Sequence, residues 1–256
     1  MNKEVIGIAG GMGPAAGIDL SEKIVSQTLA TSDQEHIPLM LFSFPGEIED
    51  RTEYIIGKSK VNPGEKIADI ILQMEKSGAT IAGIACNSAH APPVFEVVND
   101  ILKHSNSKVK LLNMIEETAL FVRTYYPSIS KVGILGTKGS YRSGLYDKLE
   151  DHGLTVVNIT QKEQELLHSA IYHRDYGIKS LTSLTGEAPQ KAKSIIIDAC
   201  LSLKAKGAEV IIFGCTEFPL VIRHNHVEGL PVIDTNLVLA RALIYASAPD
   251  KLKPWQ

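Results

Sequence analysis

Short apolar runs alternate with longer amphipathic segments along the whole chain. The apolar runs stop at Gly, Pro or polar residues and predict buried parallel strands at 5–9, 39–42, 81–85, 109–112, 132–135, 155–159, 210–213 and 232–233. The amphipathic segments carry apolar residues at helical spacing and predict helices at 15–29, 65–78, 92–104, 116–126, 140–151, 161–172, 189–206 and 236–246. Long loops at 43–62 and around Lys179 interrupt this alternation, and loops of this length at strand ends are often functional.

The chain contains an internal repeat that pairs two of its cysteines. Gly-Ala-Thr-Ile-Ala-Gly-Ile-Ala-Cys-Asn-Ser at 78–88 aligns without a gap with Gly-Ala-Glu-Val-Ile-Ile-Phe-Gly-Cys-Thr-Glu at 207–217, at an offset of 129 residues (207 − 78). Cys86 then coincides with Cys215, and each stands just after an apolar strand. The repeat indicates two similar halves, each of which presents one thiol to a shared cleft.

Strands that alternate with helices predict an α/β fold with parallel sheets and right-handed crossovers. We expect two pseudosymmetric doubly wound domains with parallel four-stranded sheets and the active site in the cleft between them. The helices after Asn113 and Asp234 occupy matching places, each leaving its own half. We therefore expect the last helix to pack back on the first domain, which gives an N-terminal domain of residues 1–115 plus 235–256 and a C-terminal domain of residues 116–234.

Composition and charge narrow the class of protein. The net charge of −3 gives no electrostatic basis for nucleic acid as a partner, and Lys and Arg are scattered. No apolar run approaches the roughly 18 residues of a membrane span, so we expect no membrane association. The N-terminus leads straight into a Gly-rich turn rather than a signal peptide. Three widely spaced cysteines are no disulfide framework, and the simplest setting for them is a reducing cytoplasm.

The paired cysteines are candidate acid/base groups. A thiol after a buried strand and before a helix start is placed for stabilisation as thiolate, which would lower its pKa modestly from about 8.5. Two thiols that face each other could remove a proton from one face of a carbon and return one to the other, without a cofactor. Alternatively, both are small buried hydrophobic residues, or they form a redox pair, although no Cys-x-x-Cys is present. Cys200 has no counterpart in the repeat and is expected to serve packing alone.

Polar and charged residues around the cysteines are candidates for substrate binding. Asn87-Ser88 and Thr216-Glu217 follow the two thiols, where side chains and backbone N–H groups suit a carboxylate, although Ser and Thr could equally cap helices. Arg51 and Lys179 lie in the two long loops. Each alone would be an ordinary solvated charge, but together they could bind a second carboxylate.

Two other kinds of site fit the sequence poorly. The turn at 10–13, which contains Met12, formally matches Gly-x-Gly-x-x-Ala, but no acidic residue closes the second strand to bind a ribose. Together with the turn at 136–139, it suggests backbone amides that line a small site. His90, His224 and His226 lie near the paired cysteines at spacings that match no common zinc site, so we expect no metal.

At these residues the sequence resembles the aspartate/glutamate racemase family. The family motifs read here Met12-Gly13-Pro14, Cys86-Asn87-Ser88-Ala89-His90 and Gly214-Cys215-Thr216-Glu217. The resemblance covers essentially the whole chain and extends to Asp50-Arg51-Thr52 and Tyr176-Gly177-Ile178-Lys179. The one departure is Ser88, where Thr is usual; it keeps the hydroxyl and loses a methyl group.

The resemblance implies two pseudosymmetric domains, no pyridoxal phosphate or other cofactor, and often a dimer. It implies Cys86 and Cys215 as the acid/base thiols and Arg51 with Lys179 as a clamp for the side-chain carboxylate. By the same resemblance, Asn87, Ser88 and Thr216 bind the α-carboxylate and amino group, and Thr137 contributes from the second turn. The candidate substrate-binding set is Met12, Arg51, Asn87, Ser88, Thr137, Lys179, Thr216 and Glu217.

The sequence thus predicts a cofactor-independent racemase of a small acidic amino acid, with aspartate expected first and glutamate second, acting as a cytoplasmic homodimer. One alternative is an isomerase or lyase that acts on a related dicarboxylic acid. The other is a small-ligand binding protein of two α/β lobes, which would bind an amino acid without exchanging its α-proton.

Overall fold

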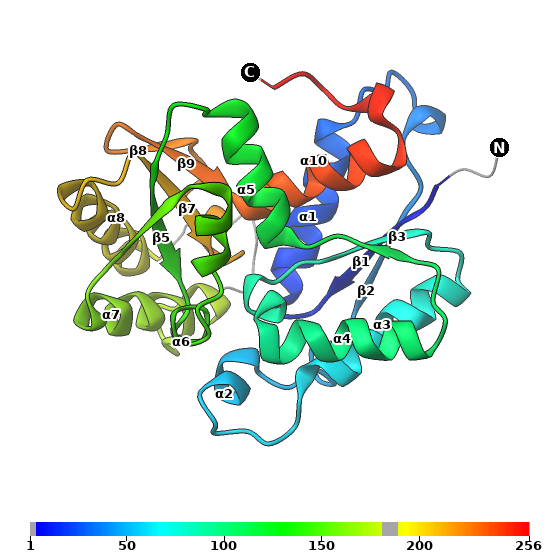
Figure 1. Ribbon diagram of the computed structural model, residues 1–256, viewed down its shortest axis with the longest axis horizontal. Helices are drawn as coiled ribbons and strands as arrows, with labels where there is room; N and C mark the ends of the chain where they lie inside the picture. Colours follow the sequence, from blue (N-terminus) through cyan, green and yellow to red (C-terminus); the bar gives the residue numbers. More distant parts are fainter. Residues whose placement is uncertain (1–3, 181–188, 256) are drawn as a thin grey trace.

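The computed structural model describes residues 4–180 and 189–255 and contains two sheets that lie side by side (Figure 1). The first sheet has four parallel strands in the order β2-β1-β3-β4. Its strands are β1 (Ile6–Gly10), β2 (Leu39–Ser43), β3 (Ile81–Ile84) and β4 (Lys110–Leu111). The second sheet has the order β6-β5-β7-β9-β8. Its strands are β5 (Lys131–Gly136), β6 (Thr155–Asn158), β7 (Val210–Gly214), β8 (His226–Val227) and β9 (Leu230–Asp234).

Helices cover both faces of each sheet, which confirms the doubly wound α/β fold. On the first sheet, α3 (Pro63–Lys76) and α4 (Pro92–His104) pack on one face, and α1 (Pro14–Gln27) packs on the other. On the second sheet, α7 (Gln161–Tyr172) and α8 (Gln190–Ala205) cover one face. The short helices of this half are α6 (Lys138–Arg142) and α9 (Phe218–Val221).

Two helices pack away from the half that precedes them. The helix α5 (Met114–Tyr125) leaves the first sheet and buries Ile115 and Val122 in the core of the second. The last helix, α10 (Thr235–Ser247), leaves the second sheet and buries Leu239 and Leu243 against Ile8 of the first. Figure 1 shows α10 beside α1, as expected for the last helix. The domain limits themselves stay a prediction.

The second sheet contains a strand that the sequence analysis missed. β8 pairs antiparallel with β9, so this sheet has five strands instead of four parallel ones. Glu228 and Gly229, at φ 51° and 80°, form the two-residue connection between the paired residues Val227 and Leu230. Two consecutive residues with positive φ match the twist of a tight hairpin. A strand of two residues is too short to leave an apolar pattern.

Two predicted elements have different local structures. The predicted helix 140–151 is broken: α6 ends at Arg142, Gly144 turns the chain at φ 62°, and a 3-10 helix follows at Asp147–His152. The predicted loop 43–62 contains a helical turn, α2 (Arg51–Ile55), whose N-terminus is capped by Asp50 through the backbone N–H of Glu53.

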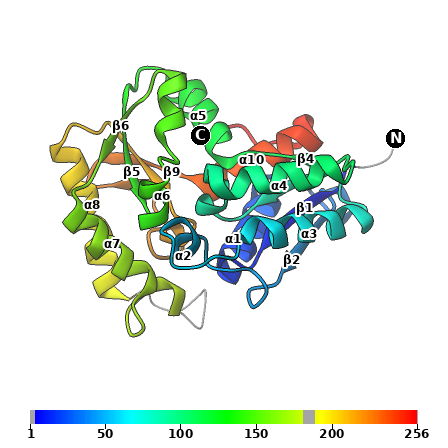
Figure 2. The same ribbon diagram turned by 60° about the horizontal axis from the view of Figure 1, so that its bottom comes forward.

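The helix α2 joins the two halves on the side where the strands end, and Figure 2 brings it forward between them. A Cβ at Gly139, in α6, would lie 3.1 Å from both Cα and Oγ1 of Thr52, which is a tight contact that Thr52 would have to shift to accommodate. Within the described residues, no helix is long and apolar enough to cross a membrane.

Candidate functional site

The paired cysteines lie at the carboxyl ends of the central strands of the two sheets. Cys86 follows β3, Cys215 follows β7, and the two side chains are 6% and 4% exposed. Both line one small cavity, together with all eight predicted binding residues and two further side chains, Thr52 and Tyr172. The cavity measures about 10 Å³, which is space for about one water molecule. The repeat therefore does bring its two thiols to a common site.

The two predicted clamp residues, Arg51 and Lys179, both donate a hydrogen bond to the backbone carbonyl of Met12. Arg51 Nη2 donates a hydrogen bond to it at 2.6 Å, and Lys179 Nζ donates another at 3.2 Å. The turn that presents this carbonyl requires glycine at Gly11, where φ is 94° and a Cβ would lie 2.9 Å from the backbone nitrogen of Phe44. Arg51 and Lys179, which are 39 and 167 positions from Met12 in the sequence, thus contact the same oxygen.

Arg51 is a buried charge, not a solvated one, because only 6% of it is exposed. Burial lowers the pKa of its guanidinium, but the charges of Cys86 and Asp50 outweigh this effect and the pKa lies above its usual value. One further hydrogen bond goes from Nη1 to the carbonyl of Glu49. Among the described residues, its buried Nε has no hydrogen-bond partner, so one donor remains for a ligand.

Glu217 connects the cationic clamp to the second thiol. Its carboxylate accepts three hydrogen bonds, from Lys179 Nζ at 2.6 Å, from the backbone N–H of Gly13 at 3.2 Å and from Cys215 Sγ at 3.1 Å. Burial alone raises the pKa of Glu217, but the Lys179 ion pair and these hydrogen bonds outweigh it, so its pKa lies below the usual range. For Lys179, burial lowers the pKa, and Glu217 raises it above the usual value. The pair is therefore ionised in this structure.

The pKa of Cys215 contradicts the modest lowering that the sequence predicts. Complete burial raises it well above the ordinary value, and the neighbouring Glu217 carboxylate raises it further, although Lys179 acts in the opposite direction. The helix after Cys215 has only four residues, Phe218–Val221, and supplies little of the expected dipole. In this structure Cys215 is a protonated thiol that donates a hydrogen bond to the Glu217 carboxylate.

Hydroxyl groups from both halves meet beside the cysteines. Ser88 Oγ lies 3.0 Å from Thr137 Oγ1, and Ser140 Oγ lies 3.4 Å from the same Ser88 oxygen. Thr137 also accepts the backbone N–H of Ser140 and caps α6, a role that the sequence had suggested for Ser88 and Thr216 instead. Thr216 Oγ1 contacts the Glu217 carboxylate at 3.3 Å. Hydroxyls at this junction can reorient as donors or acceptors for a bound carboxylate.

Asn87 is held by a chain of hydrogen bonds that crosses between the halves. Its Oδ1 accepts Tyr146 Oη at 2.5 Å, and its Nδ2 donates to Thr235 Oγ1 at 3.0 Å. Thr235 in turn donates to the carbonyl of Phe213, two residues before Cys215. Tyr146 and Thr235 were not predicted, because neither stands beside a motif and their contacts depend on the folding of distant segments.

His90 and Cys200 serve packing and local hydrogen bonding. His90 is buried, its Nδ1 lies 2.9 Å from the carbonyl of Cys86, and its ring packs against Phe95. Burial lowers its pKa to about 4, so the ring is neutral. Cys200 is buried in α8 within the core of the second half, as expected, and burial raises its pKa to about 12. Within 4–180 and 189–255, no three His, Cys, Asp or Glu side chains group as metal ligands would.

Thr52 and Tyr172 are the two cavity residues that the sequence analysis did not select. Thr52 follows Arg51 in the Asp50-Arg51-Thr52 motif, and this position beside a predicted binding residue could have identified it from the sequence. The ring of Tyr172 lies under Lys179 Nζ, which is 5.6 Å from the ring centre. Tyr172 belongs to an amphipathic helix in which nothing distinguishes it from a core residue.

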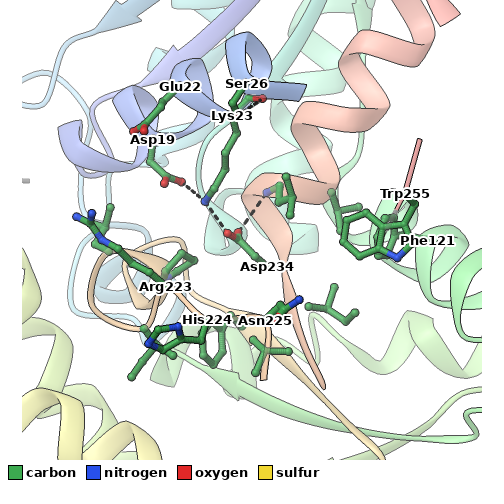
Figure 3. A pocket seen from close by; sticks show the side chains of 18 residues that line it. Asp19, Glu22, Lys23, Ser26, Phe121, Arg223, His224, Asn225, Asp234 and Trp255 are labelled. Carbon is green, nitrogen blue, oxygen red and sulfur yellow. Dashed lines mark hydrogen bonds and ion pairs between the residues drawn. The ribbon is translucent and has the colours of Figure 1, made fainter. Parts of the chain in front are cut away.

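A larger cavity, of about 330 Å³, lies away from the thiols, between α1, the segment after α9 and the start of α10 (Figure 3). Lys23 points into it between two carboxylates, with Nζ 2.5 Å from both Asp19 and Asp234. Trp255 and Phe121 form an aromatic wall on the other side. None of the predicted site residues lines this cavity.

The fold and the site together define a two-sheet α/β protein in which each sheet contributes one thiol to a common cavity. The chain belongs to the Asp/Glu/Hydantoin racemase family, whose profile matches residues 9–243. It is 24% identical over 250 residues to a broad specificity amino-acid racemase of Bacillus subtilis, with 94% of this chain and 96% of that protein covered.

Solved structures give the same result. An aspartate racemase of Picrophilus torridus superposes with a TM-score of 0.78 at 29% identity, covering 98% of this chain and 96% of that one. An aspartate racemase homologue from Pyrococcus horikoshii has a TM-score of 0.69 at 23% identity, with 97% and 100% covered. These comparisons confirm the predicted family and fold class.

Proposed function

We propose that this protein is a cofactor-independent racemase of an acidic amino acid, aspartate first and glutamate second. The observation that carries the proposal is the placement of Cys86 and Cys215, one from each half of the repeat, in one closed cavity. The chain's membership in a racemase family and its similarity to a Picrophilus torridus aspartate racemase support the same reaction class.

In the proposed mechanism one cysteine, as thiolate, takes the α-proton, and its S–H bond forms as the Cα–H bond breaks. The other cysteine, as thiol, gives its proton to the opposite face of the carbanion. The carbon is inverted, and the two cysteines have exchanged protonation states. A small, buried site favours this chemistry, because each charge interaction is stronger away from bulk water.

The surrounding polar groups have proposed roles in binding. Ser88, Thr137 and Thr216 supply hydroxyls for the α-carboxylate and amino group, and the oriented Asn87 amide completes this set. Met12 contributes its backbone carbonyl, and Glu217 balances the charge of Lys179. The space of about 10 Å³ admits no amino acid, so we expect substrate to enter an opened form of the site.

Arg51 and Lys179 are the basis for proposing an acidic substrate. Arg51 is buried and Lys179 is partly buried, and both donate to the Met12 carbonyl. Among the described groups, Arg51 also keeps an unused Nε donor. A carboxylate on the substrate side chain would satisfy that donor with a charge-assisted hydrogen bond. The similarity to a broad specificity racemase makes a panel of amino acids the proper test of this preference.

The decisive experiment is α-proton exchange in heavy water. The protein is incubated with L-aspartate and, separately, L-glutamate, without added cofactor, and the α-proton is followed by NMR beside chiral analysis. Loss of the α-proton with growth of the D-form is expected. The alternatives behave differently: a binding protein would bind without exchange, and a lyase or isomerase acting on other dicarboxylic acids would leave both amino acids unchanged.

Cysteine variants test the mechanism. Cys86→Ala and Cys215→Ala should each lower racemisation at least about 10³-fold, because each removes one of two acid/base groups. Cys200→Ala is the matched control, because this third cysteine is buried in α8 away from the cavity, and it should retain activity. Full racemisation by either of the first two variants would refute the two-thiol mechanism.

We further propose a homodimer in a reducing cytoplasm. All three cysteines are free in the structure, and the two-thiol reaction requires that they remain reduced. The dimer rests on the family resemblance and is supported by Ile18 and Val25, which are seven residues apart on one side of α1 and about half exposed. Light scattering of the purified protein measures the assembly directly.

A further inference from the structure

The two thiols have unequal surroundings, although the repeat places them symmetrically. Cys215 donates a hydrogen bond to the Glu217 carboxylate at 3.1 Å, and that carboxylate is 4% exposed. Cys86 has no acidic residue at the equivalent position, because the repeat places Ser88 where the second half has Glu217. A carboxylate in hydrogen-bond contact keeps a proton on its neighbour and opposes a second negative charge there.

Cys86 instead shares its cavity with a buried cation, Arg51. Burial lowers the pKa of the Arg51 guanidinium, and the charge of Cys86 is the largest effect that raises it. Arg51 is buried, so water screens this interaction little. A buried guanidinium is stabilised by a negative charge next to it.

We propose that Glu217 retains the proton of Cys215 while Arg51 stabilises the thiolate of Cys86, so that the empty site has one defined protonation state. Glu217 is thus a positioning residue that acts through Cys215, because it keeps the proton of that thiol in place. The consequence for catalysis rests on the proposed function: the empty enzyme is poised for the enantiomer whose α-hydrogen faces Cys86. The protonation order itself is a property of the protein without substrate.

Other titratable groups around the thiols are few and have definite states. Lys179 lies on the Cys215 side and favours a thiolate there, but its charge is partly cancelled by the 2.6 Å pair with Glu217. Tyr146 and Tyr172 remain protonated, because burial raises the pKa of each well above its usual value. His90, behind Cys86, is neutral. The asymmetry is therefore set by Glu217 and Arg51.

One turnover exchanges the protonation states of Cys86 and Cys215. The proton from the α-carbon forms an S–H bond on Cys86, and the S–H bond of Cys215 breaks as its proton reaches the carbon. The Cys215 thiolate then lies 3.1 Å from the Glu217 carboxylate. The two like charges favour a net transfer of the proton from Cys86 to Cys215, which breaks the S–H bond of Cys86, re-forms that of Cys215 and restores the resting state.

The test is a thiol titration by NMR on the intact protein labelled with ¹³Cβ-cysteine. Only three signals are expected, since the chain has three cysteines, and the Cys200→Ala, Cys86→Ala and Cys215→Ala variants assign them. The expected result is that Cys86 becomes a thiolate at lower pH than Cys215. Cys200, whose pKa is about 12, serves as the internal reference that does not titrate in the neutral range.

Two substitutions near Cys215 test whether its neighbours set its titration midpoint, and they should shift that midpoint in opposite directions. Glu217→Gln should lower the titration midpoint of Cys215 by about one pH unit or more, because it removes a charge in hydrogen-bond contact. Lys179→Met should raise that midpoint, and it keeps the inference testable where Glu217→Gln does not fold. Glu150→Gln, a change at an exposed carboxylate, is the matched control and should move neither midpoint.

The inference is overturned where Cys215 titrates before Cys86, or where Glu217→Gln leaves the Cys215 midpoint unchanged. No substrate is added, so this result is separate from the exchange experiment. A protein that racemises aspartate but shows the reverse order would refute the inference alone. A protein with the expected order but no α-proton exchange would refute only the proposed racemase.

Discussion

His90 shows how a single buried residue couples the stability of the protein to pH. Its ring is neutral in the folded protein, where burial lowers its pKa to about 4, but its unfolded pKa is the ordinary 6.5. Between these values the unfolded chain binds a proton that the folded protein does not. This contribution to stability is therefore present above pH 6.5 and is lost as the pH falls toward 4.

We predict that His90→Asn flattens this part of the stability profile. In the original protein His90 accounts for a loss of up to about 3 kcal/mol between pH 6.5 and pH 4, since one pKa unit corresponds to about 1.4 kcal/mol. The measurement is urea unfolding at several pH values for both proteins. Parallel profiles across this range would show that His90 does not ionise on unfolding. His104→Asn, at an exposed histidine, is the control.

At the scale of elements, the approach of α2 to α6 positions the cationic clamp. α2 begins with Arg51 and Thr52, and it packs against Gly139 of the other half. We predict that Gly139→Ala lowers stability by about 1–3 kcal/mol, because the new methyl group would overpack a 3.1 Å contact with Thr52. Activity should fall together with stability, since Arg51 adjoins the displaced residue.

Thermal unfolding and aspartate racemisation measure the two effects. Gly46→Ala is the matched control, because a Cβ there would meet nothing within 4 Å. An unchanged melting temperature for Gly139→Ala would show that α2 can move aside at no cost.

At the scale of the whole molecule, the ion pairs of Lys23 connect α1 to the start of α10, where the chain returns to the first sheet. Lys23 on α1 binds Asp234, which caps α10, and Asp19 at the same time (Figure 3). Burial raises the pKa of Asp19, and Lys23 counters this effect. We predict that Lys23→Met destabilises the protein by about 3 kcal/mol, because two partly buried carboxylates lose their common partner.

Chemical denaturation compares this variant with Lys58→Met, whose lysine pairs with Glu53 at 3.4 Å on the exposed surface. The control should change stability little. Equal effects of the two substitutions would mean that the buried network carries no special stabilisation.

The same scale shows what the sequence can and cannot predict. The strands and the thiol pair were predictable, since a repeat with Cys86 and Cys215 after apolar runs fixes both their local structure and their place at the sheet edge. Gly144 was visible, yet its φ of 62° breaks a helix whose apolar pattern continues. Tyr146 acts through Asn87, which only the folded chain brings near. The pKa of Cys215 was mispredicted, because complete burial depends on both halves closing together.

The exchanged positions of α5 and α10 have a consequence for how the protein is made. On the ribosome, β1 and β3 are synthesised long before α10, which together with α1 covers Ile6, Ile8 and Ile81. Until then one face of the first sheet remains partly bare, and an exposed apolar sheet face is prone to aggregation. A chain cut short before Asp234 would keep every residue of the thiol cavity and still lack the covering helix. Nascent chains of this protein therefore expose an apolar sheet face until α10 has been synthesised.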